Sequence, residues 1–290
     1  MERLSPTGSW ISPSPRLESL PEEEAANGRQ PVMLQPQRFL LGIPVYNEQK
    51  YVTQVLGEVL RYAQDVLVID DGSTDDTPLL LARQSVEVIR HAENRGYGRS
   101  MQDMLRWAKF DGFDWLITMD CDEQHEPAAI PRFIHAAQRD TADVISGSRY
   151  LLSAPSDDPP PQDRRIINAQ ITNELNARLG ISLTDAFCGF KAYRVSACER
   201  LSLDVNGYDF PMQFWVQAVV HNLRIEEIPV RLIYNDPTRS FGGPLDNPRS
   251  RLEHYRRTLH REVQRCSAVL PLGAMDGLRE PVAASLCRSC

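Results

Sequence analysis

Short apolar runs alternate with amphipathic helical patterns along the middle of the chain, and this alternation constrains the fold more than any other feature. Five runs have the length and composition of strands buried on both faces, and they cover residues 39–43, 66–69, 86–89, 115–119 and 144–145. Apolar residues recur at the spacing of one helix face in 52–60, 101–108 and 130–134. Strands and helices in alternation are joined by right-handed crossovers into a mostly parallel sheet. The sequence therefore predicts an α/β fold: a Rossmann-like, mostly parallel sheet flanked by helices on both faces.

The two ends of the chain differ from this pattern. Residues 1–37 contain six prolines and an acidic run at 22–24, without helical or strand periodicity, so we expect a disordered leader. Residues 267–290 are rich in small residues and interrupted by proline and glycine, so we expect a flexible tail. The predicted domain covers residues 38–266, with a first part at 38–150 and a second at 151–266.

Charge and composition exclude several classes of protein. The net charge of −7 argues against nucleic-acid binding, which needs clustered Lys and Arg to neutralise phosphates. No apolar run approaches the ~20 residues of a membrane-spanning helix, and the leader lacks the pattern of a secretory signal. The six cysteines have no C-x-x-C spacing, which disfavours zinc and disulfide frameworks. We therefore expect a cytoplasmic protein that binds no nucleic acid; its oligomeric state stays open.

Polar residues follow each predicted strand at the point where the strand ends. The clusters are Pro44–Glu48, Asp70–Asp75, Asn94–Arg99, Asp120–His125 and Gly147–Arg149. Because ligands of open parallel sheets bind beyond the carboxyl ends of the strands, these clusters predict one shared ligand site. The chain has no G-x-x-x-x-G-K-[ST] loop, and its Gly96–Gly98 segment lacks the third glycine of the dinucleotide fingerprint. A kinase-like ATPase and a nicotinamide enzyme are therefore disfavoured.

Asp120 and Asp122 are the centre of the predicted chemistry. On an extended chain, alternate side chains point the same way, and two carboxylates so placed repel unless a cation lies between them. A hard divalent ion prefers oxygen ligands, so the pair predicts Mg²⁺ or Mn²⁺, with Gln124 as a further oxygen ligand and His125 as a ligand or a support. The alternative is a solvated acidic turn.

Asp71 ends a strand just before Gly72, where a tight turn is easy. Its carboxylate could accept hydrogen bonds from a base or a ribose hydroxyl. The alternative is a capping role at the start of the following helix, for which Ser73–Asp75 are suited.

The ordered motifs resemble glycosyltransferase family 2, whose members have the GT-A fold. The resemblance covers roughly residues 38–235 and rests on five segments: Pro44–Glu48, Val68–Asp75, Asn94–Gly98, Asp120-x-Asp122 and Asp185–Lys191. Within the family the chain looks most like the polyprenol-phosphate (dolichol-phosphate) mannosyltransferases and glucosyltransferases. The resemblance implies an inverting transferase that uses a nucleoside diphospho-sugar of the GDP-mannose or UDP-glucose type and a divalent metal.

The resemblance also implies roles for individual residues. Residues 38–150 would bind the nucleotide, with the base and ribose lined by Pro44, Tyr46, Asn47 and Glu48. Asp71 would hold the nucleoside too, and Asp120, Asp122 and Gln124 would surround the metal. Arg149 would meet a phosphate, and Arg239 could close over the diphosphate. Residues 151–266 would bind the acceptor.

Asp185 has two possible roles, which depend on the acceptor. An alcohol needs a carboxylate to take its proton, and Asp185 is then the candidate base. A lipid phosphate is already ionised, so Asp185 would instead orient groups while Arg149, Lys191 and Arg239 hold the phosphate. A plain turn or helix cap is the third interpretation.

The leading hypothesis is a metal-dependent transfer of a hexose from a nucleotide sugar to a polyprenyl phosphate, with peripheral contact at the inner face of a membrane. Residues 248–266 predict a basic amphipathic helix, which could lie on such a surface but more often packs its apolar stripe on the core. The alternatives are a family 2 enzyme with a hydroxyl acceptor, either a saccharide or a small molecule, and a non-catalytic nucleotide-sugar-binding protein.

Overall fold

The strands and helices of the chain follow the predicted alternation. The computed structural model describes residues 36–152, 160–234 and 240–278 of the 290-residue chain. The strands are β1 (Phe39–Val45), β2 (Val66–Asp70), β3 (Glu87–Arg90), β4 (Trp115–Thr118), β5 (Val144–Ser148), β6 (Lys191–Arg194) and β7 (Ile225–Pro229). The α-helices are α1 (Val52–Val59), α2 (Thr77–Leu81), α3 (Tyr97–Phe110), α4 (Ile130–Gln138), α5 (Gln162–Leu179), α6 (Val195–Cys198), α7 (Phe210–Val220) and α8 (Pro248–Arg265). Two short 3-10 helices are η1 (Pro127–Ala129) and η2 (Gly243–Asp246).

The strands form one sheet in the order β3-β2-β1-β4-β6-β5-β7. The pairs β1–β2, β1–β4, β2–β3 and β5–β7 are parallel, whereas β6 runs antiparallel to both β4 and β5. The sheet is therefore mixed, with one reversed strand among parallel ones, and the predicted α/β class is confirmed. The sequence analysis missed β6 because Lys191, Ala192, Tyr193 and Arg194 do not form an apolar run.

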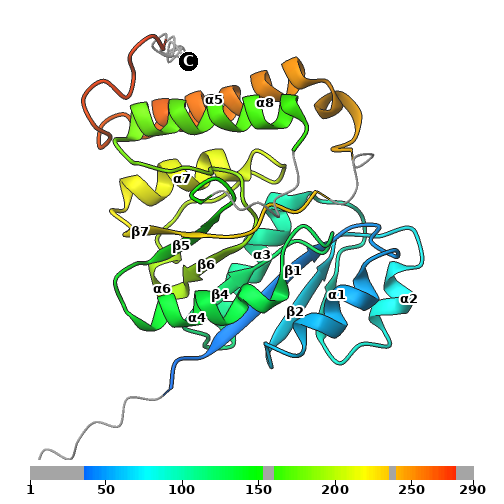
Figure 1. Cartoon of the computed structure of the whole chain (residues 1–290). Helices are drawn as coiled ribbons and strands as arrows, with labels where there is room; N and C mark the ends of the chain where they lie inside the picture. Colours follow the sequence, from blue (N-terminus) through cyan, green and yellow to red (C-terminus); the bar gives the residue numbers. More distant parts are fainter. Residues whose placement is uncertain (1–35, 153–159, 235–239, 279–290) are drawn as a thin grey trace, which may run out of the picture. The chain divides into compact units, whose positions relative to one another are not determined.

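Both faces of the sheet are covered by helices, as predicted. Along β2, Leu67 and Ile69 join one apolar cluster, and Val66 and Val68 join the other, because alternate residues point to opposite faces. The first cluster contains buried residues of α3, α5, α7 and α8, and the second contains residues of α1, α2 and α4. Figure 1 shows the sheet between these two groups of helices.

The basic helix α8 packs its apolar stripe inward. Tyr255, Leu259 and Val263 are buried, and the Arg256 Nε donates a hydrogen bond of 2.8 Å to Glu174 Oε2 on α5. Figure 1 shows α5 and α8 lying alongside each other. The apolar stripe that could have faced a membrane is therefore used in packing.

Residues 267–278 of the predicted tail also contact the domain. Ala274 is buried, and the Arg178 Nη1 on α5 donates to the carbonyl oxygens of Ala274 and Asp276 at 2.8 and 3.1 Å. The rest of the predicted tail, and residues 1–35 of the predicted leader, lie outside the described residues.

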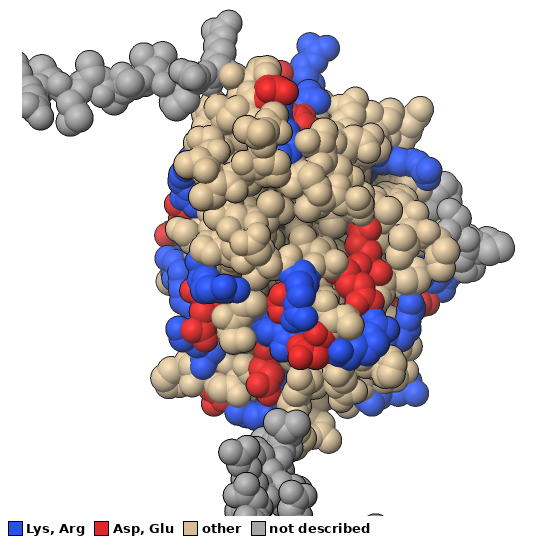
Figure 2. Space-filling view, turned by 90° about the vertical axis from the view of Figure 1, so that its left-hand side faces the viewer, with Lys and Arg blue, Asp and Glu red and all other residues tan. Residues whose placement is uncertain are grey.

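The surface mixes charges of both signs. Figure 2 shows Lys and Arg intermingled with Asp and Glu on one face of the molecule, and ion pairs such as Arg224–Asp143 and Lys109–Glu199, both at 2.9 Å, join opposite charges. None of the helices in the described segments combines the length and the apolar composition that crossing a bilayer requires.

Candidate active site

A pocket of about 1530 Å³ opens at the edge of the sheet where β1, β2, β4 and β5 end and β6 begins. Pockets for drug-sized ligands commonly measure ~300–1,000 Å³, so this one has room for two substrates. Most of the predicted site residues line it: Pro44, Tyr46, Asn47, Glu48, Asp71, Asp120, Asp122, Gln124 and Arg149. Asp185 is not among the lining residues, and Arg239 lies outside the described residues.

The loop after β1 is held by its own motif residues. Asn47 has a φ of 55°, a left-handed conformation that asparagine tolerates well, and its Oδ1 accepts a hydrogen bond of 2.8 Å from the Thr74 N–H. The Glu48 N–H donates to Thr77 Oγ1 at 2.9 Å. Tyr46 is 43% exposed and lines the pocket. Asn47 and Glu48 thus join the loop after β1 to the loop after β2 and to the start of α2, and the exposed Tyr46 ring lines the pocket.

Asp71 lines the pocket, but its carboxylate also organises the backbone. It is buried, and it accepts hydrogen bonds of 2.8 Å from the N–H groups of Arg95 and Gly96, just before α3. His91 Nδ1 lies 2.6 Å from the same carboxylate. Asp71 therefore fixes the start of α3 against β2, a contact that the sequence analysis did not anticipate.

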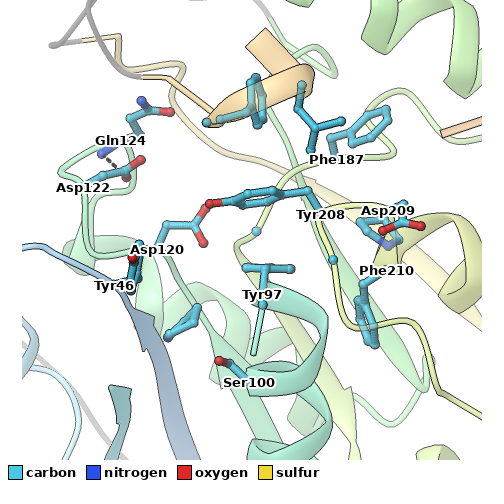
Figure 3. A pocket seen from close by; sticks show the side chains of 18 of the residues that line it. Tyr46, Tyr97, Ser100, Asp120, Asp122, Gln124, Phe187, Tyr208, Asp209 and Phe210 are labelled. Carbon is cyan, nitrogen blue, oxygen red and sulfur yellow. Dashed lines mark hydrogen bonds between the residues drawn. The ribbon is translucent and has the colours of Figure 1, made fainter. Parts of the chain in front are cut away.

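The loop after β4 carries two carboxylates to the pocket. The Asp120 side chain is 34% exposed, and its N–H donates to His125 Nδ1 at 3.0 Å. Asp122 Oδ1 accepts a hydrogen bond of 3.1 Å from the Gln124 N–H, as Figure 3 shows. Burial lowers the pKa of His125 to about 4, so its neutral ring can accept at Nδ1. His125 thereby supports the loop through the Asp120 backbone.

Gly189 leaves the space that the Asp120 carboxylate occupies. A Cβ at position 189 would lie only 2.4 Å from Asp120 Oδ2, closer than such atoms approach. A side chain at residue 189 would therefore force the Asp120 carboxylate out of its present position.

The pair Asp120 and Asp122 fits a hard divalent cation. Mg²⁺ commonly binds through one or two carboxylates and completes its shell with water and substrate phosphates. Among the described residues, the buried Gln124 Nε2 has no hydrogen-bond partner, so its N–H can donate to an oxygen of a bound ligand. Within the described segments, no group of three or more His, Cys, Asp or Glu side chains is arranged to hold a metal. The remaining ligands would therefore come from water and from oxygens of a bound substrate.

Asp185 forms a buried ion pair with Arg149. Its Oδ2 accepts from Arg149 Nε at 2.7 Å, and its Oδ1 accepts from Arg149 Nη2 at 3.0 Å and from Asn168 Nδ2 at 2.8 Å. The Asp185 side chain is 0% exposed. Burial by itself would raise its pKa, but Arg149 and Asn168 lower the pKa to about 2. Asp185 is thus a carboxylate with both oxygens occupied, and it fixes an arginine that lines the pocket.

Lys191 is a second cation in the pocket lining. It is buried at the start of β6, where its Nζ donates to the Cys188 carbonyl oxygen and lies 5.5 Å from the centroid of the Trp215 ring. Burial lowers the pKa of its ammonium group, and the nearby Asp185 opposes this shift. Lys191 and Arg149 therefore bring two positive groups to the half of the pocket formed after β5 and before β6.

Sequence reasoning placed Tyr97 in the predicted ligand site, within Asn94–Arg99, but it missed the rest of the aromatic side of the pocket. Tyr97, Tyr208 and Phe241 line it, and Figure 3 shows Tyr208 extending across the opening. The segment 204–209 places Tyr208 among the turn-forming residues Asp204, Asn206 and Gly207, which is the composition of a functional loop. This composition was the signal that could have identified it.

Comparison with known sequences identifies glycosyltransferases as relatives of this chain. The model of the family described as Glycosyl transferase family 2 matches residues 41–202. The undecaprenyl-phosphate mannosyltransferase of Micrococcus luteus is 32% identical over 207 residues, which cover 68% of this chain and 84% of that protein. The polyprenol monophosphomannose synthase of Mycolicibacterium smegmatis is 29% identical over 222 residues, covering 72% of this chain and 83% of that protein.

Comparison with solved structures confirms the GT-A fold. Glucosyl-3-phosphoglycerate synthase from Mycobacterium tuberculosis, in complex with UDP, matches with a TM-score of 0.60 at 15% identity, covering 81% of each chain. The same enzyme with Mn²⁺, UDP and glucosyl-3-phosphoglycerate matches with a TM-score of 0.58 at 16% identity, again covering 81% of each chain.

Proposed function

Because the chain belongs to glycosyltransferase family 2 and is a glycosyltransferase, we propose a specific transfer reaction for it. The enzyme moves a hexose from a nucleoside diphospho-sugar to a polyprenyl phosphate, with inversion at the anomeric carbon. Family membership disfavours the alternative of a non-catalytic nucleotide-sugar-binding protein. The names of the relatives from Micrococcus luteus and Mycolicibacterium smegmatis support a polyprenyl acceptor.

The donor is expected to lie across the ends of β1 and β4. Pro44, Tyr46 and Glu48 would surround the base and ribose, and the diphosphate would reach Asp120 and Asp122. Mg²⁺ or Mn²⁺ bound there supplies Lewis-acid neutralisation of the leaving diphosphate, typically worth several kcal/mol. The role of this chain's own residues is to hold the two carboxylates at fixed positions, through His125 and through the space beside Gly189.

One observation carries the choice of acceptor. Asp185 has both oxygens occupied and a pKa of about 2, while its partner Arg149 faces the pocket. A carboxylate so engaged is a poor base for an alcohol, because a base must be free to accept the proton. A phosphate acceptor is already ionised and needs only a fixed cation to position it. Arg149, held by Asp185, together with Lys191, supplies that charge.

This acceptor also bears on where the protein acts. A polyprenyl phosphate resides in a membrane, so the proposal includes peripheral contact with the inner, cytoplasmic face of a bilayer. Since the apolar stripe of α8 is buried, that contact is expected elsewhere than on this stripe.

The test compares two acceptors that differ by one group. Purified protein with Mn²⁺ and either GDP-mannose or UDP-glucose is offered undecaprenyl phosphate or undecaprenol in the same detergent, and products are identified by mass spectrometry. We expect a hexosyl-phosphate lipid and no product from the alcohol. Transfer to undecaprenol, or to soluble sugars alone, would refute the proposal. The Asp122→Ala variant is the inactive control.

A hydroxyl acceptor is the second candidate, and one contact favours it. His254 on α8 lines the pocket, and its Nε2 lies 3.1 Å from Asp209 Oδ1. An imidazole oriented by a buried carboxylate is a suitable general base. The undecaprenol arm of the experiment, extended to saccharide acceptors, tests this candidate directly.

A further inference from the structure

We propose that His91 is a positioning residue for the donor nucleotide: as a doubly protonated imidazolium, it holds the end of β2 to α3 behind the wall of the pocket. The inference rests on the proposed function and deepens it, because it names a group that orders the donor site from behind. His91 directly follows β3 and is 7% exposed. It is not among the residues that line the pocket, so it acts through its neighbours.

The His91 ring lies between two carboxylates from different parts of the fold. Its Nδ1 is 2.6 Å from Asp71 Oδ1, just after β2, and its Nε2 is 3.1 Å from Asp103 Oδ2 on α3. Asp71 Oδ1 already accepts a hydrogen bond of 2.8 Å from the Arg95 N–H. Asp103 Oδ2 likewise accepts from Arg99 Nε at 2.7 Å. Each carboxylate therefore faces the ring with an oxygen that acts as an acceptor.

Only one protonation state of the ring satisfies both contacts. A neutral imidazole has a single N–H, so its other nitrogen would turn a lone pair toward a carboxylate oxygen. An imidazolium donates from both nitrogens, and hydrogen bonds between charged groups are the strong ones. Burial by itself would raise the pKa of Asp103, but Arg99 and Arg106 lower it, so this acceptor is ionised at neutral pH. The geometry therefore fits a cationic ring between two anions.

The two carboxylates belong to different parts of the pocket wall. Asp71 lines the pocket and fixes, through both of its oxygens, the loop that leads into α3. Asp103 lies within α3 itself. By contacting both, His91 ties this loop to the elements on either side of it. Gly96 and Tyr97, which line the pocket at the start of α3, depend on this tie for their position.

The charge of the ring also bears on the donor. Asp71 is a buried carboxylate in the wall of a pocket that is proposed to take a diphosphate. Two anions near each other repel, and more strongly away from bulk water. A positive ring directly behind Asp71 offsets this repulsion. Loss of the His91 proton would therefore loosen the loop and leave the charge of Asp71 uncompensated, and both effects weaken nucleotide binding.

Several charged residues surround this arrangement. Those at the ends of β2 and β3, in the loop 91–96 and in the first three turns of α3 are Asp70, Asp71, Arg90, Glu93, Arg95, Arg99, Asp103 and Arg106. Arg90 pairs with Asp70 at 3.2 Å, and Arg106 pairs with Asp103 at 2.6 Å. Of this set, Asp71 and Asp103 lie within hydrogen-bond distance of the ring, and loss of a ring proton breaks one of these two contacts.

Calorimetry combined with ¹⁵N NMR tests the role of His91 without any acceptor. Each protein is titrated, in Mn²⁺, with GDP-mannose and with UDP-glucose between pH 5.5 and 8.5, and the ring nitrogens of His91 are observed over the same range. We expect the wild-type Kd to rise in step with the loss of the second ring proton, and to stay constant if the ring keeps both protons throughout.

Two variants complete the test. His91→Gln keeps one N–H donor group and carries no charge, so we expect its Kd at pH 5.5 to be raised about ten-fold and to change little with pH. His135→Gln changes an exposed histidine on α4 and is the matched control, which should behave as wild type at every pH.

The outcomes separate this inference from a merely structural role and from the proposed function. A ring that is neutral at pH 5.5, a Kd that stays constant while the ring loses its proton, or a wild-type Kd in His91→Gln would overturn it. A wild type that binds the donor but transfers nothing to polyprenyl phosphate refutes the proposed acceptor and leaves this comparison intact. Should His91→Gln not fold, the wild-type titration decides: matching pH curves for the ring and the Kd support the inference, and curves that do not match overturn it.

Discussion

The acidic loop after β4 and the buried pair after β5 use the same chemical group in opposite ways. In the acidic loop, the Asp120 side chain is 34% exposed and lines the pocket. In the buried pair, Asp185 is 0% exposed and accepts hydrogen bonds from Arg149 and Asn168. What surrounds a carboxylate therefore decides its role: one that reaches solvent in a pocket can bind a cation, whereas one buried with both oxygens hydrogen-bonded positions its donors.

The same distinction holds at the end of β2. Asp71 follows β2 much as Asp120 follows β4, but its oxygens accept from the N–H groups of Arg95 and Gly96. A carboxylate at a strand end can thus serve the backbone, a ligand or both. Three predictions test how far the acidic loop and the buried pair differ.

The largest expected effect is on the exposed carboxylate, Asp120. Asp120→Asn keeps the size of the side chain and removes its charge, so under the proposed function it would weaken binding of the cation that neutralises the leaving diphosphate. Since that neutralisation is typically worth several kcal/mol, we expect kcat/KM for hexose transfer to fall by about a thousand-fold. The measurement is initial rate against Mn²⁺ concentration.

Asp111→Asn is the matched control, because Asp111 is a half-exposed carboxylate paired with Arg38 at the far end of α3. It should keep the wild-type rate. If Asp120→Asn retained full activity with an unchanged Mn²⁺ dependence, the exposed carboxylate would have no catalytic part and the contrast with Asp185 would fail.

The second prediction concerns acid and the buried pair. The pKa of Asp185 is lowered from 3.8 to about 2 in the folded protein, so its ionisation stabilises the fold above pH about 4, and this stabilisation is lost as the pH falls toward 2. The shift corresponds to about 2 kcal/mol of unfolding free energy. The free energy of unfolding of wild type and of Asp185→Asn is measured with urea at pH 6, 4 and 3. The advantage of the wild type over the variant should shrink as the pH falls. If the difference in unfolding free energy between the two proteins stayed constant from pH 6 to pH 3, Asp185 would not be the strongly hydrogen-bonded carboxylate described above.

The sequence predicted the sheet and the acidic loop because both are local. Each strand buried on both faces appears as an apolar run, and residues that follow parallel strands must meet at one edge. β6 was missed because its polar residues, Lys191 and Arg194, interrupt the pattern. In the site, the partners of Asp185 could not be read from the sequence, because Arg149 and Asn168 come from a distant loop and a distant helix. Tyr208 was missed although a local signal was present, because the turn-forming residues Asp204, Asn206 and Gly207 surround it.

The smallest expected effect comes from changing Gly189, a residue whose lack of a side chain makes room for Asp120. Gly189 lies between the two regions, and a Cβ there would meet the Asp120 carboxylate at 2.4, 2.8 and 2.8 Å. Gly189→Ala should therefore push Asp120 aside while leaving the Asp185–Arg149 pair in place, and we expect Mn²⁺-supported binding of the sugar nucleotide to weaken about ten-fold.

Gly57→Ala is the matched control, because a Cβ at Gly57 in α1 meets nothing within 4 Å, and the change should only stabilise the helix by ~0.5–1 kcal/mol. Calorimetry with and without Mn²⁺ distinguishes the outcomes: a displaced Asp120 weakens only the Mn²⁺-dependent binding. If Gly189→Ala instead lowered both affinities equally, residue 189 would support the whole pocket, and the acidic loop and the buried pair would be one mechanical unit.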